Sequence, residues 1–128
     1  MLDSELAFML TLSHELSQRQ IAAFPARTVK GAQSVIAQFR LSIDLLVINC
    51  SRPGACTFAK ALAGSQPGVS VVAIVSERYA CRRCADDVVA RFCDPQDRAS
   101  ERIGYCADVI QSLLKEQRRH AERAGGNQ

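Results

Sequence analysis

A chain of 128 residues, 48% hydrophobic and 23% charged, has the size and composition of one globular domain with a single core. The net charge of +3 is too weak for the basic patch of a nucleic-acid-binding protein, so we expect no nucleic-acid partner. No apolar run is long enough to span a membrane, and the acidic start MLDSEL lacks the basic region of a signal peptide, so we expect a cytoplasmic protein.

Apolar residues recur with helical spacing in the first part of the chain and predict two helices. The first covers residues 4–18, and the second runs from Thr28, a suitable N-cap, to about residue 40. Between them, residues 21–26 (IAAFPA) form a short apolar run. We predict it as a strand end or an edge strand, because Pro25 has no amide hydrogen to donate.

Two continuously apolar runs in the middle of the chain predict strands that are buried on both faces. They cover residues 43–50 (IDLLVINC) and 69–76 (VSVVAIVS), with a helix over about 56–63 between them. Residues 87–92 (DVVARF) predict a further strand. The polar stretch 77–86 before it leaves room for at most two helical turns.

A long amphipathic helix over about 99–121 completes the pattern. The alternation of strands and helices predicts a parallel sheet covered on both faces, which is a three-layer α/β sandwich of four or five strands. We expect one domain over residues 1–118 and a polar tail over residues 119–128.

The most distinctive stretch is Asp44–Gly54 (DLLVINCSRPG), which resembles the phosphorylation-site strand and loop of bacterial response-regulator receiver domains. In that family an aspartate, four apolar residues and the phosphoacceptor aspartate are followed, after a short loop, by Pro-Gly. Asp44 and the pair Pro53-Gly54 fall in that register, and Asn49 occupies the phosphoacceptor position. The resemblance implies a flavodoxin-like fold with strand order 2-1-3-4-5 and a role in two-component, or phosphorelay, signalling.

The same resemblance assigns positions to the other functional groups of a receiver. In the family, an acidic cluster that binds magnesium follows the first strand, a switch hydroxyl ends the fourth strand, and a Lys-Pro pair follows the fifth. The corresponding residues here are the cluster Asp3, Ser4 and Glu5, the hydroxyl of Ser76, and the pair Asp94-Pro95.

Three departures from that pattern remove the chemistry of phosphoryl transfer. Asn49 carries an amide, which is a far poorer nucleophile than a carboxylate. Asp94 replaces the lysine and would repel a phosphate, and the acidic cluster is reduced to Asp3 with Glu5 as a helper. We therefore expect a pseudo-receiver that is not an enzyme and has no cofactor. Asp3 and Glu5 are the candidate ligands if Mg²⁺ binds at all.

A fourth departure is structural, because only Met1 and Leu2 precede Asp3, whereas the first strand of a receiver lies inside the sheet. We expect this strand to be truncated or missing, either because translation starts further upstream or because the chain is shortened. A missing inner strand leaves backbone groups unpaired on both neighbours. We therefore expect a gap in the sheet, low stability, or a strand borrowed from another chain.

The chain also has six cysteines, of which Cys81 and Cys84 show the CxxC spacing. A structural zinc site needs a second such pair or two suitably placed histidines, and Cys93 and Cys106 do not form one. Small buried side chains are the favoured interpretation. A redox or zinc-binding interaction module built on Cys81 and Cys84 is an alternative, since the flanking arginines favour the thiolate.

These observations favour a regulatory domain that acts by protein–protein interaction without aspartate phosphorylation. The expected partner is a sensor kinase, an output domain or a second copy, and the expected contact face includes residues 77–118. A second hypothesis keeps phosphorylation but places it on a surviving acid, such as Asp3 or Asp94, with the help of a metal.

Overall fold

The computed structural model describes residues 1–76, 88–94 and 97–126. The elements are, in chain order, helices α1 (Leu6–Gln18) and α2 (Val29–Phe39), strand β1 (Leu45–Asn49), helix α3 (Ala55–Ser65), strands β2 (Ser70–Ser76) and β3 (Val88–Asp94), the short 3-10 helix η2 (Ser100–Arg102) and helix α4 (Ile103–Gly126). The predicted helices and strands therefore appear close to their expected bounds, with two exceptions. Residues 77–86 lie outside the described ranges, and residues 21–26 form no continuous strand.

The sheet is parallel, with β2 between β1 and β3. On the other side of β1, Leu2 forms single parallel bridges to Ile48 of β1 and to Ala26. The spatial order of the segments is therefore Ala26, Leu2, β1, β2, β3, which is the order 2-1-3-4-5 with its first two positions reduced to one residue each. This topology confirms the predicted flavodoxin-like fold.

Among the described residues, Leu2 alone fills the position where the resemblance places the first strand. Where we expected four or five strands, the described residues form three continuous strands and two single bridges. Residues 21–25 form no β-ladder, because no described strand lies beside them.

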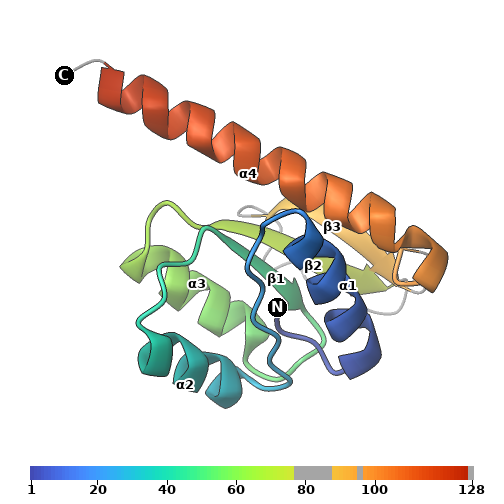
Figure 1. Cartoon of the computed structure of the whole chain (residues 1–128). Coiled ribbons are helices and arrows are strands. Elements are labelled where there is room, and N and C mark those ends of the chain that lie inside the picture. The colour runs from blue at the N-terminus through green and yellow to red at the C-terminus, as the bar shows by residue number, and fades with distance from the viewer. Residues whose placement is uncertain (77–87, 95–96, 127–128) are drawn as a thin grey trace.

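Helices cover both faces of the sheet, α1 and α4 on one face and α2 and α3 on the other (Figure 1). Alternate strand residues supply the two cores. Val47 packs with the α1 and α4 residues, whereas its neighbours Leu46 and Ile48 pack with α3. The three-layer sandwich is thus built by strands whose side chains are apolar in both directions.

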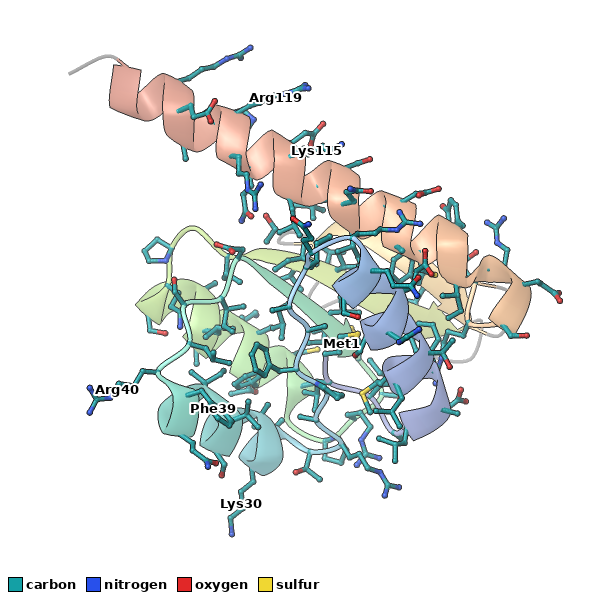
Figure 2. All side chains as sticks on the ribbon, viewed as in Figure 1. Met1, Lys30, Phe39, Arg40, Lys115 and Arg119 are labelled. Atoms are coloured by element: carbon teal, nitrogen blue, oxygen red, sulfur yellow. The ribbon has the colours of Figure 1, made fainter. Side chains whose placement is uncertain are left out.

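Two helices show how local sequence sets their bounds. Thr28 caps α2 as predicted, because its side-chain oxygen accepts a hydrogen bond from the Gly31 amide at 3.0 Å. Helix α4 runs to Gly126, beyond the expected end near residue 121, so residues 119–126 are helical. Their Arg, Gln and Glu residues favour helix, and Lys115 and Arg119 point away from the body of the molecule (Figure 2).

Within the described ranges, no helix is long and apolar enough to cross a membrane.

Candidate functional site: a closed acidic pocket

The carboxyl ends of the central strands bring Asp3 and Asn49 together. The Leu2 amide donates to the Val47 carbonyl at 2.8 Å, and the Asn49 amide donates to the Leu2 carbonyl at 2.8 Å. This pairing carries the next residue, Asp3, alongside the end of β1. Asp3 is 1% exposed and Asn49 is 8% exposed. The two residues that the receiver pattern assigned to one site therefore share a buried pocket.

Both ends of the Asn49 side-chain amide are engaged. Its Oδ1 accepts hydrogen bonds from the Ser51 amide at 3.0 Å and from the Ser51 hydroxyl at 2.6 Å. A backbone N–H can only donate, so it fixes the oxygen on that side and the NH₂ group on the other. The Nδ2 group accordingly donates to Oδ1 of Asp3 at 2.9 Å. An amide therefore complements the Asp3 carboxylate, whereas an aspartate at position 49 would repel it.

Arg98 supplies the positive charge of the pocket. Its guanidinium nitrogen lies 2.9 Å from Oδ2 of Asp3 and 2.8 Å from Oε2 of Glu5. The side chains of Arg98 and Asp3 are buried, whereas that of Glu5 is 58% exposed. The Arg98–Asp3 pair is thus an internal ion pair, which protects a carboxylate that would be costly to bury alone.

Asp97, the neighbour of Arg98, is tied to the end of β3. Its carboxylate accepts a hydrogen bond from the Cys93 amide at 2.8 Å, and its own amide donates to the Cys93 carbonyl at 2.8 Å. The Arg98 guanidinium carbon then lies 5.4 Å from the centre of the Phe8 ring on α1, a cation–π distance. Arg98 is therefore held from three sides by a turn, a ring and two carboxylates.

This arrangement does not fit a resident Mg²⁺ ion. Mg²⁺ in proteins is bound through one or two carboxylates whose oxygens face the metal. Here Oδ2 of Asp3 and the Glu5 carboxylate face Arg98, and Oδ1 of Asn49 faces Ser51. The guanidinium occupies the place where a cation would balance the two acids.

Arg98 is the functional residue that the sequence interpretation missed. Its position in the stretch DPQDRAS carries no family pattern that we used. The available signal was physical, because a buried acid such as Asp3 needs a counter-charge when its metal partners are lost. The arginines that follow the last strand are the candidates for that role.

The other predicted site residues are placed as follows. Ser4 is exposed and its amide donates to Oδ1 of Asp3 at 2.7 Å. Pro53 and Gly54 form the turn after β1, and Gly54 begins α3 with a φ of +75°, a backbone conformation that favours glycine. Ser76 and Asp94 pair in register at the ends of β2 and β3.

The cysteines contribute no metal site among the described residues. Pro95 and the CxxC pair, Cys81 and Cys84, lie outside the described ranges. Cys106 is buried, and burial raises the pKa of its thiol to about 11, which keeps it protonated and unreactive at neutral pH. In the part of the chain that the structure describes, no three His, Cys, Asp or Glu side chains are grouped to hold a metal ion.

Comparisons with known proteins identify the fold. No protein-family model and no curated protein matches the chain. A response regulator receiver domain protein from Clostridium thermocellum superposes with a TM-score of 0.69 at 11% identity, covering 91% of this chain and 93% of that one. The beryllofluoride-activated NtrC4 receiver domain dimer gives a TM-score of 0.67 at 16% identity, covering 91% and 94%.

A longer protein also resembles the chain. NtrX from Brucella abortus, solved in complex with ADP, gives a TM-score of 0.72 at 14% identity. That match covers 97% of this chain but only 27% of NtrX. Because all these identities are low, the comparisons speak for the fold alone. The chain has the CheY-like fold of response-regulator receiver domains.

Proposed function

We propose that the chain is a regulatory receiver-like domain of two-component signalling that acts through protein contacts and is not phosphorylated at position 49. The observation that carries this proposal is the set of hydrogen bonds and ion pairs that joins Asn49, Asp3, Ser51 and Arg98. The Asn49 amide bonds Asp3 and Ser51, and the Arg98 guanidinium neutralises Asp3. The polar groups that would meet a metal and a phosphoryl group are thus engaged with one another.

The chemistry of each side chain supports the same conclusion. Phosphoryl transfer to a receiver requires a carboxylate nucleophile, and an amide nitrogen or oxygen at position 49 is a poor substitute. Asp3 is the acid nearest to that position, but both of its oxygens are engaged, by Asn49, by the Ser4 amide and by Arg98. No described contact favours Asp3 as a replacement acceptor.

The arginine also suggests how such a domain holds one state. In a phosphorylated receiver the charge at this pocket changes with the signal, whereas Arg98 is a permanent cation tied to the turn after β3. We infer that the pocket fixes the end of β3 and the start of α4 in one arrangement. A partner would then recognise a constant surface.

The surface of β3 and α4 has side chains suited to such contact. Val89 is 53% exposed on β3, and Tyr105 is 42% exposed near the start of α4, where the guanidinium carbon of Arg102 lies 4.0 Å from its ring centre. Exposed valine, tyrosine and arginine side chains are typical of protein interfaces. We propose this face for a sensor kinase, an output domain or a second copy.

The proposal is tested by titrating Mg²⁺ into the protein while following its unfolding temperature and the amide resonances of Asp3 and Asn49. The wild type should show no saturable change at millimolar Mg²⁺, because Arg98 already neutralises the acids. The double variant Asn49→Asp/Arg98→Ala exposes the carboxylates and should gain saturable binding and stabilisation.

A matched control is the double variant Asn49→Asp/Arg102→Ala, which removes an exposed arginine and keeps Arg98. It should bind Mg²⁺ more weakly than the variant that lacks Arg98. Saturable Mg²⁺ binding by the wild type at these resonances would overturn the closed-pocket proposal.

A further inference from the structure

The layer formed by α2 and α3 carries positive charge without acidic residues. Between residues 16 and 76, Asp44 is the only Asp or Glu in the sequence, and neither helix contains one. The basic residues of this layer and of the loops that enter it are Arg27, Lys30, Arg40, Arg52 and Lys60. In the described ranges, no ion pair includes any of them. This side of the molecule therefore attracts negatively charged partners.

The other layer differs, because its charges are largely paired within the chain. Arg19, at the end of α1, lies 3.0 Å from the carboxylate of Glu15 and 2.5 Å from that of Asp108 on α4. Arg102 pairs with Asp97 at 3.3 Å. The weak net charge of +3 therefore conceals a strong asymmetry between the two layers.

An exposed aromatic pair lies at the end of α2. Phe39, the last residue of the helix, is 58% exposed, the highest value among the large hydrophobic residues in the described part of the chain. Its ring centre lies 6.2 Å from that of Phe24, which is 39% exposed. Phe24 and Val35 also line an apolar groove of about 910 Å³ that is bordered by residues 41–46. Exposed aromatic side chains next to basic ones are typical of protein interfaces.

Arg40 ends α2 in a backbone conformation that disfavours its own side chain. Its φ and ψ are both 50°, in the left-handed region, and its amide donates to the Ile36 carbonyl. Glycine is the common residue at such a helix end, because a Cβ atom there crowds the following carbonyl. Among the described residues, the guanidinium of Arg40 has no ion-pair partner that would offset this preference. A local rule that is broken without a gain inside the chain points to a role outside it.

The cations flank the aromatic pair at a spacing that a peptide can match. Figure 2 shows Lys30 and Arg40 extending away from the body of the molecule at opposite ends of α2, with Phe39 close to Arg40. The backbone positions of Lys30 and Arg40 are roughly 15 Å apart along the helix axis. An extended peptide covers that distance with about five residues. Two carboxylates at this spacing could therefore reach both cations while an apolar side chain between them meets the rings.

Two other classes of negatively charged partner fit less well. A nucleic acid presents phosphates at a much closer spacing, and the two rings already contact each other, so no base can insert between them. A membrane surface needs a broad apolar helix face, whereas the exposed face of α2 bears Gln33, Ser34 and Gln38. A protein segment with spaced carboxylates and an apolar side chain matches both the charges and the rings.

We propose that the end of α2 is a docking site for an acidic protein segment. In this site Phe24 and Phe39 receive an apolar side chain of the partner, and Arg40 binds a flanking carboxylate, while Arg27 and Lys30 extend the positive potential along the helix. The surface lies in the layer opposite α4, so it is separate from the β3–α4 face assigned to signalling partners. The inference therefore goes beyond the proposed function.

The probe is a fluorescently labelled peptide of about 12 residues in which glutamates flank a central Leu-Phe pair. A second peptide of equal length and charge carries Ser-Ser in place of Leu-Phe. Fluorescence anisotropy at low salt should show saturable binding of the first peptide to the wild type and about tenfold weaker binding of the second. No saturable binding of the first peptide, or equal binding of both, would overturn the proposal.

Charge reversal tests whether binding is local. Arg40→Glu should weaken binding of the Leu-Phe peptide by about tenfold or more. Arg119→Glu makes the same change in net charge on α4, where Arg119 points away from the body of the molecule, and it should leave the affinity within about twofold of the wild type (Figure 2). Equal weakening by the two variants would show general attraction to a basic protein and would contradict a site on α2.

A glycine variant separates binding from folding. Arg40→Gly suits the left-handed backbone, so it should keep or raise the unfolding temperature and still lose the same affinity as Arg40→Glu. Gln20→Gly is the matched control, because Gln20 ends α1 with a φ of 61°. It should bind the peptide as the wild type does. Full peptide binding by Arg40→Gly would remove Arg40 from the site.

The aromatic contribution is tested in the same way. Phe39→Ser should weaken binding of the Leu-Phe peptide by about tenfold and bring it to the level of the Ser-Ser peptide. Leu10→Ser, on α1, removes another exposed apolar side chain, which is 52% exposed, and should leave binding unchanged. Equal effects of the two variants would overturn the role of the aromatic pair.

Competing partners are measured beside the peptide. Tighter binding of a single-stranded oligonucleotide of similar length, or of phosphatidylcholine vesicles that contain phosphatidylglycerol, would overturn the choice of a protein segment. Dimer formation in sedimentation experiments that Arg40→Glu abolishes would assign the surface to a second copy and contradict the proposal. These outcomes are independent of the Mg²⁺ test of the acidic pocket, since α2 contributes no residue to that pocket.

Discussion

The two ends of β1 differ in how their polar groups are satisfied. At the carboxyl end, Asp3, Asn49, Ser51 and Arg98 form a closed set of hydrogen bonds and ion pairs. At the amino end, Leu45 pairs with Ser70 of β2 on one side and lines an apolar groove. One end therefore holds a packed polar cluster, while the other borders an apolar groove.

The contrast teaches that the polar cluster at one end of β1 forms independently of strand pairing at the other end. The pocket residues Asn49 and Arg98 complement each other's surroundings, which is the pattern expected of a stable arrangement. The groove at the amino end is lined mainly by apolar side chains and has no comparable polar cluster among the described residues. Residues 1–3 connect the two ends, since Met1 borders the groove and Asp3 enters the pocket.

The largest effect is expected from breaking the ion pair of the closed end. Arg98→Met leaves the Asp3 carboxylate buried without a counter-charge, which should lower the free energy of unfolding by about 3–5 kcal/mol. Urea denaturation followed by circular dichroism measures this loss. The double variant Asp3→Asn/Arg98→Met should lose less than the sum of the two single variants, because they share one interaction.

Arg102 provides the matched control for that experiment. It pairs with Asp97 at 3.3 Å but is 45% exposed, so Arg102→Met should cost about 1 kcal/mol or less. If Arg98→Met costs no more than Arg102→Met, the closed pocket is not the stabilising cluster described above.

A smaller effect is expected at the open end. Thr28 caps α2, the helix that borders the groove, and Thr28→Ala should lower the free energy of unfolding by about 1 kcal/mol. Ser34→Ala, on an exposed position of the same helix, should change it little. An unmeasurable cost of Thr28→Ala would show that α2 does not depend on its cap.

Much of the fold was predictable because its signals are local. The apolar runs of β1 and β2, the Thr28 cap and the Pro53-Gly54 turn each follow from a few neighbouring residues. The meeting of Asp3 with Asn49 was predictable from the receiver resemblance, since the carboxyl ends of adjacent parallel strands share one edge.

The remaining features depend on contacts between distant segments. Arg98 reaches Asp3 across the whole chain, and only the turn held by Asp97 directs it there. The strand expected over 21–26 failed because its neighbour is reduced to Leu2. Helix α4 ends beyond the expected residue 121 because the Arg, Gln and Glu residues near its end favour helix without a hydrophobic pattern.

The most direct test of the central claim is intact-mass spectrometry of the wild-type chain after incubation with acetyl phosphate and Mg²⁺. A receiver domain with an intact phosphoacceptor, treated in parallel, shows that the donor is active. We predict an unmodified mass for the wild type, because Asn49 is no nucleophile and Arg98 neutralises Asp3. A phosphoryl adduct on the wild type would contradict the account and locate the acceptor on another residue.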